Sequence, residues 1–301
     1  MAPISIFPSV KDRSYRFILT LSFLYTMVSL LVPAFRLVPR FPVPVFTFLL
    51  GYGLYRASFI PEKLKAWVFY VILVMSYWQL RFIVSTNFHD FHGSEVVALE
   101  KKIFGCLPNA WLQDRLYKGH TSWFEYIFAV FHGSLFVIPV GFALLMQWKR
   151  GTNRMKRTAA ALSFLALAGY STYILYPLTP PWMAALERLI PPLERITMRA
   201  LCSMTPEGTV SLFSPSPRGA MPSLHSGVPI LVLIMAFKEF GRKAWLFFPV
   251  VAGICFEVVY GAEHYVVDVM AGLLYAVIAY VLVYVILFPD RVVDGNGGLN
   301  S

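Results

Sequence analysis

Charged residues and cysteines are scarce in this sequence. Only 14% of its 301 residues are charged, whereas 57% are hydrophobic. A soluble domain carries about 25% charged and about 45–50% apolar residues, so the chain lacks the polar surface of a soluble enzyme and is too apolar for a disordered protein. Its 3 cysteines are odd in number and form no CxxC pair, which argues against a disulfide framework or a zinc site. A polytopic membrane protein remains.

Long apolar runs support this interpretation. A membrane-spanning helix takes about 20 residues, and runs of that order with few charges recur along the chain. They lie at roughly 17–37, 43–60, 66–86, 123–148, 158–178, 222–238, 244–261 and 265–288. The sequence therefore predicts an all-α, polytopic membrane helical bundle. Four prolines between residues 33 and 44 leave a re-entrant hairpin as an alternative for the first two runs.

The net charge of +10 is read as a topology signal. The cations are not gathered on one soluble element, so nucleic acid is not an expected partner. Clusters at residues 11–16, 63–65, 149–157 and 238–243 fall on one side of the membrane if all eight runs cross it. Lys and Arg in short loops mark the cytoplasmic side, which predicts cytoplasmic termini and long outer loops at 87–122 and 179–221.

The domain organisation follows from these runs. We expect N-terminal membrane helices over 1–64, a six-helix core over 65–288 and a flexible tail over 289–301. Surface helices are expected in both outer loops. Ser94 is the predicted cap of one, and the other, near 182–203, is interrupted by two prolines.

Two short stretches carry the chemistry. Residues 218–227 (RGAMPSLHSG) enter the sixth run, and residues 263–268 (EHYVVD) enter the eighth, so both are expected at the outer membrane face. Histidines and a carboxylate at that depth are costly unless they are used. His264 and Asp268 are spaced i, i+4 and share a helix face, so the carboxylate can orient the ring.

Roles for the remaining residues of these stretches follow from chemistry. With one ring nitrogen of His264 fixed, the other is free to act as a nucleophile or base. His225 is placed to act on the opposite side of a reacting group, and the start of the sixth run with Ser223 offers donors to a phosphate. A lone histidine in a membrane helix is as often a packing residue as a functional one. Two such stretches on one side of the membrane favour catalysis.

At these residues the sequence resembles the type 2 phosphatidic acid phosphatase superfamily. That superfamily has a P-S-x-H motif and a later H-x-x-x-D motif on six core helices, matched here by residues 222–225 and 264–268. The resemblance implies that His264 attacks phosphorus, that Asp268 orients it, and that His225 protonates the leaving alcohol. It implies no metal and no cofactor, because cations and backbone donors meet the phosphoryl charge.

Within the superfamily, the resemblance is closer to the branch of fungal inositol phosphorylceramide synthase and its bacterial relatives. Residues 176–183 and 220–226 are similar to that branch, as are parts of the loop from 98 to 113. Where the lipid phosphatases have an arginine six residues before the nucleophilic histidine, this chain has Val258, preceded by Glu257. A site with fewer cations suits a phosphate diester better than a dianionic monoester.

The sequence therefore predicts an integral membrane phosphotransferase for phospholipid or sphingolipid head groups, with an acceptor alcohol or water as the second substrate. The alternatives are a lipid phosphate phosphatase, of phosphatidate or polyprenyl diphosphate type, and a non-catalytic transporter or receptor. Arg218 and Arg81 are candidate phosphate ligands, and His132 is a candidate for the head-group pocket. His89 and His92 have a ligand-like spacing but are more simply surface residues, and Glu263 is a candidate to tune His264 or to bind an acceptor hydroxyl.

Overall fold

The computed structural model describes residues 13–31, 42–84, 92–206 and 218–289. The first four helices in the chain are α1 (Arg13–Leu31), α2 (Pro42–Arg56), α3 (Glu62–Lys65) and α4 (Val68–Val84). The helices of the outer surface are α5 (Ser94–Phe104), α6 (Pro108–Leu116), α10 (Pro181–Leu186) and α11 (Ile196–Met204). The remaining helices are α7 (Trp123–Gly133), η2 (Ser134–Phe136), α8 (Val137–Arg150), α9 (Thr152–Leu175), α13 (Leu224–Phe240), η3 (Gly241–Leu246), α14 (Phe248–Tyr260), α15 (Val266–Tyr280) and η4 (Val281–Leu287).

The all-α fold class is confirmed. Within the described ranges the only bridges between extended segments are isolated ones, from Leu178 to His92 and to Gly219. Four helical stretches among these residues are long and apolar enough to cross a bilayer, namely Trp123–Arg150, Thr152–Leu175, Leu224–Leu246 and Val266–Leu287. The protein is thus a multi-pass membrane protein, and the expected eight crossings remain a prediction.

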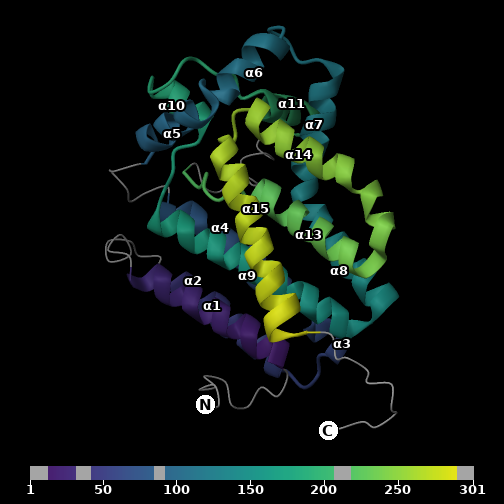
Figure 1. Cartoon of the computed structure of the whole chain (residues 1–301). Helices are drawn as coiled ribbons and strands as arrows, with labels where there is room; N and C mark the ends of the chain where they lie inside the picture. Colours follow the sequence, from purple (N-terminus) through teal and green to yellow (C-terminus); the bar gives the residue numbers. More distant parts are fainter. Residues whose placement is uncertain (1–12, 32–41, 85–91, 207–217, 290–301) are drawn as a thin grey trace.

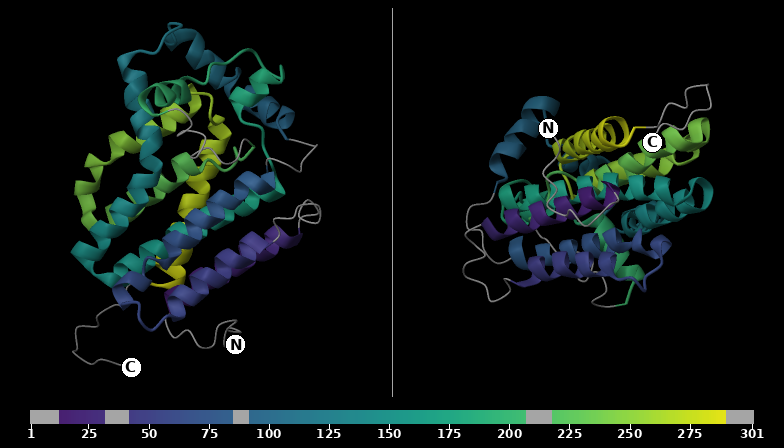
Figure 2. Two further views of the ribbon diagram at one scale, coloured as in Figure 1. Left: turned by 180° about the vertical axis from the view of Figure 1, so that it is seen from behind. Right: turned by 90° about the horizontal axis from the view of Figure 1, so that it is seen from below.

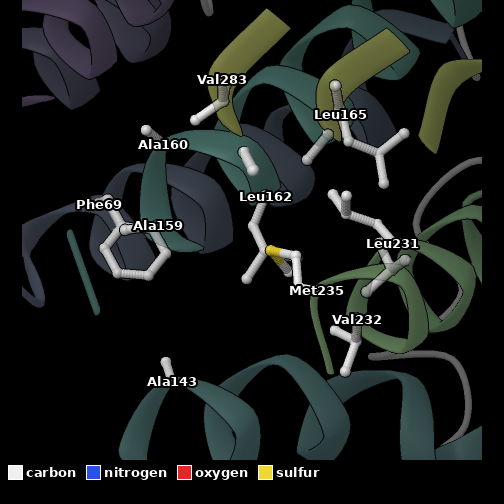
Figure 3. Close-up of a cluster of buried hydrophobic side chains, with 14 of the residues drawn as sticks. Phe69, Ala143, Ala159, Ala160, Leu162, Leu165, Leu231, Val232, Met235 and Val283 are labelled. Atoms are coloured by element: carbon white, nitrogen blue, oxygen red, sulfur yellow. The ribbon is translucent and has the colours of Figure 1, made fainter. Parts of the chain in front are cut away.

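Helix α9 forms the centre of the bundle. It packs against α1, α4, α8, α13 and α15, and Figure 3 shows its side chains meeting those of α13 and η4. Three successive alanines, Ala159–Ala161, are at most 1% exposed and let neighbouring helices approach closely. The N-terminal helices α1 and α2 pack on the outside of this centre, against α9 and α4 respectively (Figure 2).

Helices α13 and α15 approach each other closely near their first turns. A Cβ added to Gly272 would lie 2.4 Å from the Ser223 carbonyl oxygen, and one added to Gly227 would lie 3.0 Å from the Gly272 carbonyl oxygen. Any side chain at Gly272 would push the two helix starts apart. Since these starts carry the two predicted motifs, the small residues set the spacing of the site.

The two ends of the bundle differ. Figure 1 shows α5, α6, α10 and α11 together at one end, while α1 begins and α15 with η4 finishes at the other. The predicted basic clusters meet at that second end: Gln147 Nε2 donates to the Lys63 carbonyl, and Arg150 and Arg154 form ion pairs with Glu239. The structure is therefore consistent with the prediction that these basic clusters lie on one side of the membrane. The assignment of that side to the cytoplasm remains a prediction.

The surface helices lie in the two loops where they were predicted, but one predicted helix cap is not observed. Residues 191 and 192 do separate α10 from α11. The prediction that Ser94 caps α5 is wrong. Gly93 is the cap, and Ser94 is the first helical residue, with its hydroxyl donating to Glu95. The expected flexible tail lies outside the described residues, apart from its first residue.

Candidate active site

The two sequence motifs meet beneath the outer helices. The backbone N–H of Ser223 donates to the Asp268 carbonyl at 2.9 Å, which joins the start of α13 to the start of α15. The hydroxyl of Tyr173 on α9 donates to the Pro222 carbonyl at 2.7 Å. These bonds fix the PSLH stretch against α15, so residues 39 positions apart in the chain, His225 and His264, become neighbours.

His264 is held at one ring nitrogen. Its Nδ1 lies 2.8 Å from the Ala220 carbonyl oxygen and 3.6 Å from Asp268 Oδ2. A carbonyl oxygen only accepts, so we assign the proton of the ring to Nδ1. Asp268 is fully buried, and its Oδ2 accepts the Tyr265 N–H at 2.8 Å. The nearest partner of the His264 Nδ1 is thus the Ala220 carbonyl, and the Asp268 carboxylate lies farther away.

The other nitrogen of His264 faces His225. Its Nε2 lies 3.1 Å from His225 Nδ1. Since Nε2 carries the lone pair in the assigned tautomer, His225 donates across this contact. A phosphoryl group bound between the two rings would replace this contact, with the lone pair on one side and a proton donor on the other. This geometry is what nucleophilic attack and leaving-group protonation require.

A third histidine continues the row. The ring of His132 on α7 stacks on His225, with centroids 4.3 Å apart and planes 25° apart. Its Nδ1 lies 3.0 Å from Glu257 Oε1 on α14, and this glutamate is fully buried. The structure thus brings His132 to the site, where its buried ring contacts His225. Glu257 is a site residue that the sequence interpretation noted only as a departure from the phosphatase pattern.

The other expected ligands are placed as follows. Ser223 is fully buried and caps α13, since its Oγ accepts the Ser226 N–H at 3.3 Å. Arg218 is paired with Glu187 at 2.9 Å and donates to Thr179 Oγ1 at 3.1 Å. The side chain of Arg81, on α4, lies outside the described part of the structure. Their roles toward a phosphate remain predictions.

Metal binding has no support at the weaker candidate positions. His89 lies outside the described residues, and His92 stacks on Tyr176 and contacts Glu95 at 2.5 Å. In the described ranges no three His, Cys, Asp or Glu side chains converge as a metal site. The expectation that no metal or cofactor takes part stays a prediction.

The outer helix α6 holds the turn that carries His264. Asn109 Nδ2 donates to the carbonyls of Val259 and His264, at 2.7 and 2.9 Å. Gln113 donates to the carbonyls of Tyr260 and Glu194 and accepts the Glu194 N–H. These amides were not predicted as site residues. Of the two, only Gln113 lies in a segment whose sequence is similar to one branch of the superfamily.

An arginine that the sequence interpretation missed binds Glu263, which that interpretation named as a candidate site residue. Arg195, just before α11, binds Glu263 through two bonds, Nε to Oε1 at 2.6 Å and Nη2 to Oε2 at 2.8 Å. Its guanidinium lies 4.2 Å from the ring centroid of Trp182. Glu263 directly precedes His264 in the chain, so Arg195 binds the turn that carries the proposed nucleophile.

Glu100 on α5 supports α15 from outside the bundle. It is fully buried, and its Oε1 accepts the Val267 N–H at 2.9 Å. Burial raises the pKa of Glu100 to about 7, with a smaller rise from the charge of Asp268, and the hydrogen bonds from the backbone partly oppose this. A carboxyl group of the outer loop is thus poised to titrate near neutrality at the start of the helix that carries Asp268.

This pKa predicts a pH-dependent stability. A free glutamate titrates near 4.5, so the folded protein binds this proton more tightly than the unfolded chain. The stability that Glu100 contributes is therefore complete below about pH 4.5 and lost as pH rises through about 7. Glu100→Gln keeps an acceptor for Val267 and should flatten this dependence, raising Tm in detergent above about pH 7. Asp114→Asn, an exposed change on α6, is the control. An unchanged pH slope in Glu100→Gln would contradict the assignment.

A known protein family matches the part of the chain that carries this site. Residues 94–282, more than half of the chain, match the PAP2 superfamily. The chain is 24% identical over 218 residues to phosphoinositol dihydroceramide synthase of Bacteroides thetaiotaomicron, covering 68% of this chain and 71% of that protein. It is 28% identical over 144 residues to inositol phosphorylceramide synthase catalytic subunit aur1 of Schizosaccharomyces pombe, covering 44% of this chain and 33% of that protein. No solved structure matches significantly.

The matched region contains both motifs, the row of three histidines and the outer helices that hold them. The predicted resemblance is confirmed, and so is the predicted function at the level of a membrane enzyme for lipid phosphotransfer. The chain belongs to the PAP2 superfamily.

Proposed function

We propose that this protein transfers a phosphoinositol head group from a phospholipid to a ceramide-type alcohol through a phosphohistidine at His264. The observation that carries the proposal is the fixed pair of imidazoles. His264 presents Nε2 to His225 at 3.1 Å while its Nδ1 is held by a carbonyl. The names of the two relatives support phosphoinositol as the group and a ceramide as the acceptor.

The first half of the reaction breaks the donor lipid. His264 Nε2 attacks phosphorus, the P–N bond forms, and the bond from phosphorus to the oxygen of the lipid alcohol breaks. His225, which enters this step as the imidazolium, gives its Nδ1 proton to that oxygen, so the lipid leaves as a neutral alcohol and His225 becomes neutral. The ring of His264 is then cationic, and the buried Asp268 carboxylate at 3.6 Å stabilises it.

The second half regenerates the enzyme. His225, now neutral, takes the proton of the acceptor hydroxyl. The acceptor oxygen attacks phosphorus as the P–N bond breaks, which returns the lone pair to His264. The same two residues thus serve both halves, and water in place of the alcohol would give hydrolysis. We place this site on the non-cytoplasmic face, because the basic clusters gather at the opposite end of the bundle.

Partition between acceptors tests the proposal. Purified protein in detergent receives phosphatidylinositol labelled with ³²P, with and without dihydroceramide. With the ceramide we expect most label in a new lipid and little in water-soluble phosphoinositol, because the acceptor excludes water from the phosphohistidine. A control without the ceramide should show slow release to water. Label that goes to water at the same rate with and without the alcohol would instead indicate a phosphatase.

A further inference from the structure

Arg195 has a fixed orientation on the turn that carries His264. Two bonds to Glu263 hold one edge of the guanidinium, and the face of Trp182 lies 4.2 Å from its carbon. The backbone N–H of Trp182 donates to the Ala262 carbonyl at 3.0 Å, which ties this residue to the same turn as His264. The cation is therefore preorganised and does not need to be ordered by a ligand.

Part of this guanidinium is available for a ligand. An arginine has five N–H donors, and the bonds to Glu263 use two of them. Among the residues that the structure describes, the Nη1 edge has no hydrogen-bond partner, and the side chain is 28% exposed. Three donors on a fixed cation, open to the surface, are well suited to phosphate oxygens.

Arg195 is connected to the reacting groups through its charge and through the residues that hold it. Its charge interacts with the rings of His132 and His225, and its anchor Glu263 adjoins His264 in the chain. Gln113 bridges the carbonyls of Glu194 and Tyr260, so the segment before α11 is fixed relative to the turn of the nucleophile. A cation anchored to this turn can therefore contribute to binding a phosphoryl group between His264 and His225.

We propose that Arg195 binds the phosphoryl group of the donor lipid at His264, with Glu263 as its positioning residue. The inference rests on the proposed function. Arg195, at the N-cap of α11, supplies a cation that the phosphatase pattern provides through an arginine at the position where this chain has Val258. The charge of Arg195 is shared with Glu263, so the site suits the single negative charge of a diester better than the two charges of a monoester.

Substitution with chemical rescue tests the role. Arg195→Ala should lower kcat/KM for phosphatidylinositol about 100-fold, since one charge-stabilising donor group is lost. Guanidinium ion added to this variant should restore part of the activity, and Arg195→Lys should retain an intermediate rate. Inhibition by orthovanadate, a phosphate mimic, should be strongest in wild type, weaker in Arg195→Lys and weakest in Arg195→Ala. Arg199→Gln, one turn further along α11 and paired with Glu194 and Tyr117, is the matched control and should behave as wild type.

The outcomes separate this proposal from the proposed function. If Arg195→Ala keeps its kcat/KM and its vanadate affinity while His264→Ala is inactive, Arg195 is not the phosphate ligand and the phosphohistidine proposal stands. Activity lost without guanidinium rescue, and with unchanged vanadate inhibition, would also overturn it, since that result indicates a structural role. If His264→Ala is as active as wild type, the proposed function itself fails.

Discussion

Replacing His264 with alanine is expected to lower turnover at least about 1,000-fold, the scale of losing a catalytic nucleophile. The variant loses the ring nitrogen that faces His225 at 3.1 Å, so no P–N bond forms at this position. It should still fold, because the contacts that hold the turn at this position use the backbone: the His264 N–H donates to Val258, and its carbonyl accepts from Asn109.

Trapping of the intermediate makes this prediction specific. Brief reaction of wild type with ³²P-phosphatidylinositol, followed by alkaline denaturation, should leave acid-labile label on His264. Asp268→Asn should lower turnover about 1,000-fold while leaving a measurable trace of label, because asparagine cannot offset the cationic ring. His120→Ala, an exposed residue of the outer loop, serves as the control and should label normally.

Two results would remove His264 from this role. One is turnover near the wild-type rate in His264→Ala, and the other is label that survives acid and maps to a serine. Melting in detergent and reconstitution into vesicles separate a chemical defect from a folding defect, since an unfolded variant loses both stability and label.

The sequence predicted the parts of the fold that depend on local pattern. Apolar runs of span length became the helices of the bundle, and the prolines at 191 and 192 separate α10 from α11 as expected. The P-S-x-H and H-x-x-x-D motifs were also predicted to meet, because each stands at the start of a helix and both helices start at the same end. Topology alone was sufficient for that conclusion.

Features that depend on packing between distant segments were not predicted. Arg195 and Glu263 are 68 residues apart, and His132 and Glu257 are 125 apart, so no spacing rule relates them. Ser94 was expected to cap α5 because serine favours that position, but the helix starts one residue earlier, at the cap Gly93. Which polar side chains pair inside a membrane bundle depends on helix rotation, and apolar runs without a strong periodicity do not define it.

Replacing His225 with alanine is expected to slow transfer from a natural lipid donor about 100- to 10,000-fold, the usual contribution of a general acid. The alcohol of a lipid is a poor leaving group unless its oxygen receives a proton. In the structure His225 Nδ1 is the group that faces the reacting nitrogen, and its ring is fixed by stacking on His132 at 4.3 Å. A role in protonation therefore predicts a defect that depends on the leaving group.

An aryl ester distinguishes this role from simple positioning. Inositol 4-nitrophenyl phosphate expels a stable phenolate that needs no proton, so His225→Ala should release nitrophenol within about 10-fold of the wild-type rate. His264→Ala should be inactive toward both substrates, because the nucleophile is needed whatever leaves. If His225→Ala is equally impaired toward the lipid and the aryl ester, its ring acts by holding the Nε2 of His264 in place. In that case the proton must reach the leaving oxygen from another group.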